Sequence, residues 1–358
     1  MARILLLVEL KGGNDGLNTV IPYADPLYRE LRPDIGLARE RVLQLDERVG
    51  LHARLEPLIT AWQARDLAIV QGVGYPDPSR SHFRSIEIWD TASSSGKTLS
   101  EGWVARAFEH AALPKGAGVD SIAIDTNARP LMGPDLRTVV MQDAETFLRQ
   151  TQALRSEPVD NGGNPALRHL LAVQREVNAA AADLRDELQA APNPVHAYAG
   201  DPFGQQLDLA TRLIAGGVPV VAVKIALAGF DTHADQVSIH EALLAALAGG
   251  LAAFRYNMIA AGRWDDVLVL TYSEFGRRAR QNASRGTDHG AAAPQFVLGG
   301  RVKGGLHGSY PSLADLQDGD LRHTVDFRDV YSTIARGCWD RSVAFGQRTG
   351  QKLDLVAS

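Results

Sequence analysis

The chain has 358 residues, of which 45% are hydrophobic and 22% are charged, and this composition is ordinary for a globular protein with a large core. The formal net charge of -5 excludes the strong basic field that draws a protein to nucleic acid. The single cysteine, Cys338, excludes an internal disulfide and a cysteine-rich zinc site.

The N-terminal sequence predicts a protein that is not exported. Its first apolar run covers only residues 4–8 before Glu9 and Lys11, so the run is too short for the core of a signal peptide. No apolar run reaches the roughly 18–20 residues that span a bilayer. As given, the chain is therefore expected to be cytoplasmic, with neither a membrane nor nucleic acid as a partner.

Apolar runs without alternation, bounded by turn residues, predict a series of strands that are buried on both faces. These strands are expected at residues 4–10, 67–70, 119–124, 136–141, 218–225, 267–271 and 296–298. Apolar residues at helical spacing predict helices at residues 51–65, from 81 onwards, and at 102–113, 165–190, 203–215, 243–261 and 327–336. This alternation predicts one α/β domain over residues 1–358, with a helical insertion or lid around 160–195.

The helix that starts at Ser81 is a candidate for chemistry. A serine at a helix start ordinarily caps the helix through its side chain. The free backbone N–H groups and the helix dipole there would also favour a nucleophile or a bound oxyanion. Arg80, His82 and Arg84 lie within about one turn and would add positive charge. Both interpretations of Ser81, cap and nucleophile, stay open at this point.

Acids and histidines follow three of the predicted strands. Ligand sites in open α/β sheets lie at the carboxyl ends of the strands, and carboxylate and imidazole groups suit zinc or manganese. Each motif alone is also explained by a turn or a helix cap, but three in one chain favour a shared site for one or two divalent cations. The candidate metal ligands are Asp15, Asp231, His233, Glu274, Asp288 and His289.

Five segments in order along nearly the whole chain carry the motifs of a known family. They are residues 12–16 (GGNDG), 81–83 (SHF), 230–233 (FDTH), 273–277 (SEFGR) and 286–290 (GTDHG). Together they resemble the DUF1501 family, a bacterial group related to the alkaline phosphatase and sulfatase superfamily. The resemblance implies a three-layer α/β/α sandwich around a mixed, mostly parallel sheet.

The resemblance also implies roles for single residues. Asp15 matches the first metal ligand of the superfamily, and His289 resembles a later histidine ligand. Asp231 and His233 resemble an acid-and-histidine pair, at a shorter spacing. Where relatives have an Asp-His pair after a strand, this chain has Glu274 and Phe275, so one histidine is missing and Asp288 would compensate. Family members commonly carry a twin-arginine export signal, which leaves periplasmic export open.

The same comparison bears on the nucleophile. Sulfatases have a Cys or Ser two residues before a Pro-Ser-Arg triplet, and here Pro76 holds that position before Pro78, Ser79 and Arg80. A formylglycine sulfatase is therefore not expected. Ser81 is the predicted nucleophile, with Ser79 as the next candidate. The predicted oxyanion-binding residues are Arg80 and Arg277.

The sequence thus predicts a metal-dependent hydrolase of phosphate or sulfate esters, small or polymeric, with zinc or manganese favoured. The alternative is a non-catalytic binding or assembly protein that keeps the fold with a degraded metal site. The missing histidine at Phe275 favours that alternative. A serine esterase is a weaker interpretation, because no serine lies in a Gly-x-Ser-x-Gly turn between a strand and a helix.

Overall fold

A computed structural model describes residues 3–111, 113, 118–143, 145–147, 149, 181–346 and 353–357. Its centre is a nine-stranded sheet in the order β11-β5-β10-β9-β1-β8-β6-β7, with β14 beside β5. The strands are β1 (Ile4–Lys11), β5 (Leu67–Gly74), β6 (Ser121–Ile124), β7 (Thr138–Met141), β8 (Ala222–Ala228), β9 (Val267–Tyr272), β10 (Ala293–Leu298), β11 (Gly305–His307) and β14 (Val325–Asp326).

The sheet is mixed and mostly parallel, as the family resemblance implies. β1 pairs in parallel with β8 and β9, β6 with β7 and β8, and β5 with β11 and β14. β10 runs antiparallel to its two neighbours, β5 and β9. Because β1, β8 and β9 are parallel neighbours, their carboxyl ends and the loops that follow them lie at one edge of the sheet.

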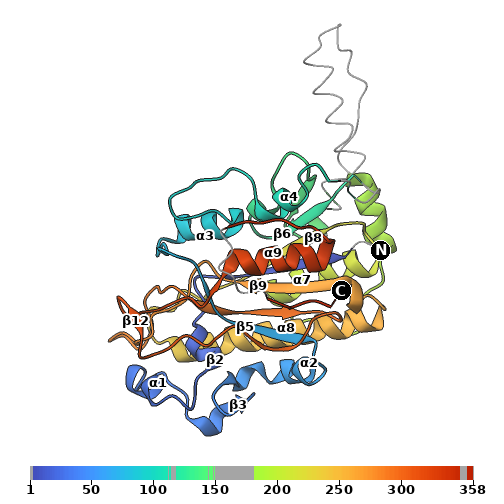
Figure 1. Ribbon diagram of the computed structural model, residues 1–358. Coiled ribbons are helices and arrows are strands. Elements are labelled where there is room, and N and C mark those ends of the chain that lie inside the picture. The colour runs from blue at the N-terminus through green and yellow to red at the C-terminus, as the bar shows by residue number, and fades with distance from the viewer. Residues whose placement is uncertain are drawn as a thin grey trace.

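Helices cover both faces of this sheet, which gives the three expected layers. α3 (His82–Thr91), α4 (Trp103–Ala107) and α9 (Phe327–Trp339) contribute to the core on one face. α2 (Ile59–Gln63), α7 (Pro202–Ala215) and α8 (Gln236–Ala260) contribute to the core on the other face. Figure 1 shows α3, α4 and α9 on one side of the sheet and α2 and α8 on the opposite side.

Smaller elements extend the sandwich at its lower side in Figure 1. The helix α1 (Pro26–Leu31) lies near a three-stranded sheet of β2 (Val20–Ile21), β3 (Val42–Gln44) and β4 (Gly50–His52). β12 (Leu316–Gln317) and β13 (Asp320–Leu321) form a hairpin. Short 3-10 helices complete the described elements: η1 (Gly16–Asn18), η2 (Arg39–Arg41), η3 (Ala53–Leu58), η4 (Arg129–Leu131) and η5 (Trp264–Asp266).

Several predicted boundaries are wrong. The strand expected at 218–225 runs from Ala222 to Ala228, because its register with β1 pairs Ala228 with Lys11 at the strand end. The helix expected at 51–65 is divided among β4, η3 and α2. The helix expected at 102–113 ends at Ala107. Such limits are set by tertiary pairing more than by local sequence pattern.

The helical insertion expected around 160–195 lies partly outside the described residues. Residues 181–190 are helical, and Leu184 and Leu188 are fully buried in the core beside α7 and α8. This described part of the segment therefore packs onto the domain. The single domain over 1–358 stays a prediction.

The helix α8 begins seven residues earlier than predicted and has a 25-residue length. By length and composition it could span a membrane, with a mean hydropathy of 1.6 over its most apolar window. It packs Leu244, Leu247, Leu251 and Phe254 into the core cluster, so one face of the helix lies against the sheet.

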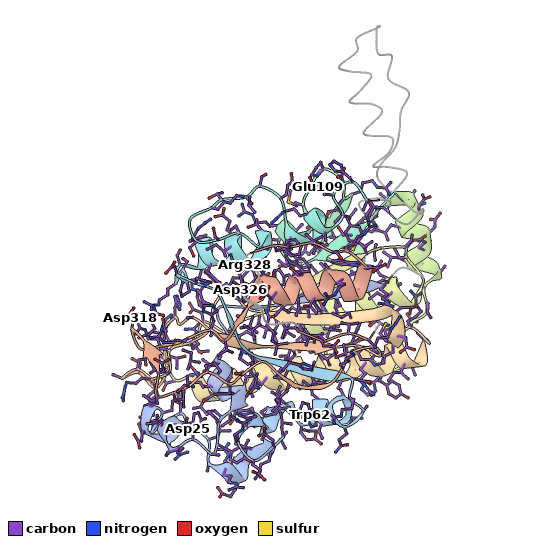
Figure 2. All side chains as sticks on the ribbon, in the orientation of Figure 1. Asp25, Trp62, Glu109, Asp318, Asp326 and Arg328 are labelled. Carbon is purple, nitrogen blue, oxygen red and sulfur yellow. The ribbon has the colours of Figure 1, made fainter. Side chains whose placement is uncertain are left out.

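The ends of the helices are fixed by local polar contacts. At the start of α9, Asp326 accepts a hydrogen bond from the backbone N–H of Arg328 at 2.9 Å and pairs with its guanidinium (Figure 2). At the start of α7, Asp201 accepts from Gly204 N at 2.7 Å. Ser81 occupies the same position before α3, but its side chain makes no capping hydrogen bond. Ser81 is therefore the N-cap residue of α3 by position, but it does not cap the helix through its side chain.

Candidate metal centre

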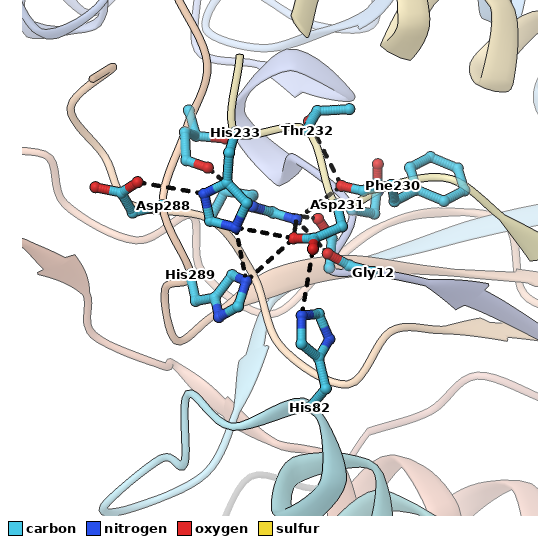
Figure 3. A network of polar contacts seen from close by, with 12 residues as sticks. Gly12, His82, Phe230, Asp231, Thr232, His233, Asp288 and His289 are labelled. Atoms are coloured by element: carbon cyan, nitrogen blue, oxygen red, sulfur yellow. Dashed lines mark hydrogen bonds and ion pairs between the residues drawn. The ribbon is translucent and has the colours of Figure 1, made fainter. Parts of the chain in front are cut away.

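Three imidazole rings converge on the carboxylate of Asp231 at the carboxyl edge of the sheet (Figure 3). The Nε2 atoms of His233 and His289 lie 3.0 Å and 3.1 Å from Asp231 Oδ1. The Nε2 atom of His82 lies 3.4 Å from Asp231 Oδ2. The four residues come from three segments: the first residue of α3, the loop after β8 and the loop before β10.

The other ring nitrogen of each histidine faces an oxygen acceptor. His82 Nδ1 lies 3.0 Å from Glu274 Oε1, and His289 Nδ1 lies 2.8 Å from the backbone oxygen of Arg80. His233 Nδ1 lies 3.4 Å from Asp288 Oδ1. These acceptors favour the tautomer with the proton on Nδ1, which leaves the Nε2 lone pair free. A metal-binding histidine ordinarily has this second-sphere partner.

The spacing of the inner atoms fits a single metal ion. Ligand atoms of His82, Asp231 and His289 all lie within 4.8 Å of one another, and these three residues form the group in the described part of the chain that could hold a cation. His233 Nε2 approaches His289 Nε2 to 3.0 Å, next to this group. Ligands in a tetrahedral zinc site lie about 3.3 Å apart, given metal–ligand bonds of about 2.0 Å, so these side chains would draw closer together around an ion. The donor types, imidazole nitrogen and carboxylate oxygen, suit a transition metal.

The electrostatics keep the carboxylates of this site ionised. Burial raises the pKa of Asp231, but neighbouring groups, above all the hydrogen bond from Arg277, outweigh that effect and lower the pKa to about 2. The hydrogen bond from Asn282 is the main cause that holds the pKa of Asp288 below its ordinary value. An ionised Asp231 is the form that coordinates a cation.

Close backbone approach brings the loop after β1 against Asp231. Gly12 has a φ of +111°, and a Cβ atom at this position would collide with the backbone of Asp231. Its N–H donates to Glu274 Oε1 at 2.9 Å, the oxygen that also faces His82. Glycine is required here because other residues rarely adopt this backbone conformation. The first strand therefore supports the site through its backbone.

Arg277 lies beneath the site, and its role differs from the predicted one. Its side chain is completely buried and donates to Asp231 Oδ1 at 2.7 Å. The other hydrogen bonds of its guanidinium go to the backbone oxygens of Gly12, Gly13, Phe230 and Thr287. All three guanidinium nitrogens therefore donate to groups of the protein, and the side chain has no exposed surface. The prediction that Arg277 clamps an oxyanion is therefore wrong, and Arg277 instead holds three loops and Asp231 together.

Arg80 is also engaged elsewhere. Its Nε atom donates to Asp320 Oδ2 at 2.9 Å, in an ion pair with a nearly buried carboxylate. Its backbone oxygen accepts from His289. Arg80 therefore contributes to the site through its main chain, and the prediction that its guanidinium binds an oxyanion does not agree with this ion pair.

Asp15 is buried beside the site and is paired with a different cation. Its Oδ2 atom lies 2.6 Å from Arg32 Nη1, and both side chains are fully buried. Burial raises the pKa of Asp15, but the neighbouring Arg32 charge and hydrogen bond hold it below its ordinary value. Asp15 is not in the group of converging ligand atoms. Its predicted role as a ligand is thus replaced by an ion pair with Arg32.

Glu274 and Phe275 form the wall behind the histidines. Glu274 is 5% exposed and acts on the site through His82, while its Oε2 atom is buried without a hydrogen-bond partner. The Phe275 ring stacks on His289 with centroids 4.3 Å apart and packs on His82 at 4.9 Å. Phe275, which stands where relatives have a histidine, therefore packs against the imidazole rings of His82 and His289.

The structure thus brings together Asp231, His233 and His289, with Glu274 and Asp288 in supporting positions. His82 is not among the predicted metal ligands, because a single histidine at a helix start has no pattern of its own. Its signal is its place in the SHF motif at residues 81–83, between β5 and α3.

Fold and site together define an α/β protein with a candidate metal centre at the carboxyl edge of its sheet. The chain belongs to the DUF1501 family, described as proteins of unknown function, whose sequence model matches residues 43–339. This membership confirms the resemblance. No curated protein matches the sequence significantly.

Solved structures of other proteins align with most of this chain at low identity. The lipoteichoic acid synthase LtaP from Listeria monocytogenes is 10% identical, with 96% of this chain and 74% of that chain covered and a TM-score of 0.40. A protein in the alkaline phosphatase superfamily from Vibrio parahaemolyticus is 11% identical, with 94% of this chain and 66% of that chain covered and a TM-score of 0.40. The C-terminal periplasmic domain of EptC from Escherichia coli, in complex with zinc, is 12% identical, with 83% of this chain and 72% of that chain covered and a TM-score of 0.36.

The cytoplasmic location expected for this chain stays a prediction.

Proposed function

We propose that this protein is a metal-dependent hydrolase of phosphate or sulfate esters. The observation that carries the proposal is the convergence of three Nε2 atoms on Asp231, each histidine being held at Nδ1 by an acceptor. His82, Asp231 and His289 would hold one cation, with His233 beside them, and zinc or manganese suits these donors. When bound, the metal would supply Lewis-acid polarisation of an ester oxygen.

Ser81 is the proposed nucleophile. It is exposed, directly precedes His82, and its side chain makes no capping hydrogen bond. The first turn of a helix leaves backbone N–H groups without helical acceptors, and the helix dipole favours negative charge there. The N-terminus of α3 would therefore orient an anionic ester beside Ser81, in place of the two arginines that are engaged elsewhere.

A second candidate function is metal binding without hydrolysis. The engagement of Arg277 with Asp231 and four backbone oxygens, and of Arg80 with Asp320, favours this alternative. Neither predicted arginine presents its guanidinium to a substrate. The protein would then be a binding or assembly protein whose metal centre stabilises one arrangement of its loops.

Metal analysis combined with a Ser81→Ala variant tests these proposals. The purified, unchelated protein is examined for transition metals and for hydrolysis of 4-nitrophenyl phosphate, sulfate and phosphonate esters. The hydrolase proposal predicts that Ser81→Ala keeps the metal of the wild type and loses hydrolysis. Ser79→Ala removes the second candidate nucleophile in the same loop and should keep both properties if Ser81 is the nucleophile.

The other outcomes separate the two candidates. A wild-type protein that holds zinc or manganese but hydrolyses no ester in the panel would support the binding function. A wild-type protein that is metal-free and takes up neither added zinc nor added manganese would contradict both candidates. Equal hydrolysis by Ser81→Ala would refute Ser81 as the nucleophile while leaving the metal centre intact.

A further inference from the structure

Gln236, the first residue of α8, joins the two loops that carry the metal-site residues. Its side chain is completely buried. Its Oε1 atom accepts hydrogen bonds from the hydroxyls of Thr287 at 2.6 Å and Thr232 at 3.1 Å. Its Nε2 atom donates to Asp15 Oδ2. The amide orientation is consistent, because oxygen faces two donors and nitrogen faces a carboxylate.

The two threonines are adjacent in sequence to the site residues. Thr232 lies between Asp231 and His233 (Figure 3). Thr287 directly precedes Asp288 in the sequence. The backbone N–H of Thr287 also donates to the backbone oxygen of Thr232 at 3.2 Å. Neither segment is a helix or a strand, so hydrogen bonds of this kind determine where its side chains lie.

Gln236 donates to Asp15, and Asp15 is itself held by Arg32. Asp15 receives Arg32 Nη1 at 2.6 Å, and Arg32 also donates from Nε to the backbone oxygen of Ala279 at 2.9 Å. A continuous path of buried polar groups therefore runs from Arg32 through Asp15 and Gln236 to the two threonines. Asp15, which was expected to bind metal, is thus connected to the site indirectly, through Gln236 and the two threonines.

We propose that Gln236 is a positioning residue for the metal centre, setting the loop of Asp231 and His233 against the loop of His289. The inference rests on the metal centre of the proposed function and extends it to a residue that touches no ligand atom. Outer partners of metal ligands typically change metal affinity by about 10–100-fold. Gln236→Leu is therefore expected to weaken zinc binding about tenfold or more.

The chain offers a matched control in Gln206 on α7. Gln206 is also buried, and its amide makes two hydrogen bonds to the backbone of Ala226, at 2.8 Å and 3.1 Å. Gln206→Leu removes a buried amide of the same kind without touching either loop of the site. Both variants should lower the free energy of unfolding of the metal-free protein, but only Gln236→Leu should weaken zinc binding.

A conservative pair at Thr287 separates positioning from packing. Thr287→Ser keeps the hydroxyl that donates to Gln236, whereas Thr287→Val keeps the shape and removes the donor. The inference predicts zinc affinity near that of the wild type for Thr287→Ser and weaker binding for Thr287→Val. A packing role would instead give the stronger effect in Thr287→Ser, which lacks the methyl group.

The measurement is the zinc dissociation constant of the full chain, obtained by competition with a chromogenic chelator, together with urea unfolding of each metal-free variant. Equal zinc affinity in Gln236→Leu, Gln206→Leu and the wild type would overturn the inference and leave the proposed function standing. A wild type that binds no zinc would overturn the metal centre and the inference with it. Selective loss in Gln236→Leu and Thr287→Val would support both.

Discussion

Glu274 Oε1 lies 3.0 Å from His82 Nδ1 although 192 residues separate the two in sequence. The same oxygen accepts the N–H of Gly12 at 2.9 Å, so its position is fixed by the end of β1. A carboxylate at this place orients the imidazole and makes its Nε2 a better electron donor. Glu274, which was expected to bind metal directly, would therefore act on a bound metal through a histidine.

Replacement of Glu274 by Gln should weaken zinc binding by about 10–100-fold, because the amide no longer increases the basicity of His82. Asp288→Asn is the matched comparison at His233. Asp288 is 56% exposed and lies 3.4 Å from its histidine, so water can replace it and the effect should be smaller. Zinc titration of both metal-free variants measures the difference, and a larger effect at Asp288 would contradict this ranking.

Asp15→Ala should destabilise the fold, because it leaves the guanidinium of Arg32 buried without its carboxylate. Breaking a buried ion pair by removing one partner costs about 3–5 kcal/mol. Arg322→Ala, which removes an exposed ion pair with Asp315, should change stability by about 1 kcal/mol or less. Urea unfolding of the metal-free proteins provides the comparison. An Asp15→Ala variant that is as stable as the wild type but metal-free would restore Asp15 as a direct ligand.

Arg277→Lys should lower both the stability and the zinc affinity, because an ammonium cannot reach the acceptors that the buried guanidinium binds. Leaving buried oxygens without donors costs about 1–3 kcal/mol for each group. An oxyanion clamp would behave differently: KM for an ester would rise while stability and zinc binding stayed unchanged. Unfolding, zinc titration and steady-state kinetics on one preparation distinguish the two roles.

Acidification should destabilise the metal-free protein between pH 6.5 and about 4. Burial is the main cause that lowers the pKa of His240 from 6.5 to about 4. Below pH 6.5, His240 takes up a proton in the unfolded chain but not in the folded chain. The free energy of unfolding therefore decreases as the pH is lowered. At about 1.4 kcal/mol for each pKa unit, the loss for His240 is roughly 3 kcal/mol.

His240→Gln keeps a donor toward Asn14, which His240 contacts at 3.0 Å, but does not titrate. The pH dependence of urea unfolding should therefore be flatter in this variant. His52, whose pKa is also lowered by burial to about 4, would still contribute to the slope in both proteins. An unchanged pH profile in His240→Gln would show that His240 does not account for the acid sensitivity.

The sequence sufficed for seven of the nine strands and for the edge at which the site lies, whereas the short strands β11 and β14 were not predicted. Unalternating apolar runs identified β1 and β9, and parallel strands bring their carboxyl ends together whatever the loops contain. For the same reason Asp231, His233 and His289 could be placed in one site. The local sequence is enough to predict that a residue follows the end of a buried strand.

Which acids would touch a metal could not be predicted, because that depends on partners remote in sequence. Asp15 and Asp231 both follow buried strands, yet Arg32 pairs with one and three imidazoles approach the other. Arg277 has the charge and the donor groups of an anion-binding residue. Only its burial under three loops shows that it binds protein oxygens instead. His82 had no local pattern to identify it, since its partners Asp231 and Glu274 come much later in the chain.

The site also constrains the order of events during synthesis of the protein. His289 lies 209 residues after Arg80, whose backbone oxygen faces its ring nitrogen Nδ1. Contacts of such separation form late in folding, since long loops must close first. A nascent chain that ends before His289 lacks one of the three candidate ligands, so the proposed metal site could form only after synthesis has passed this residue.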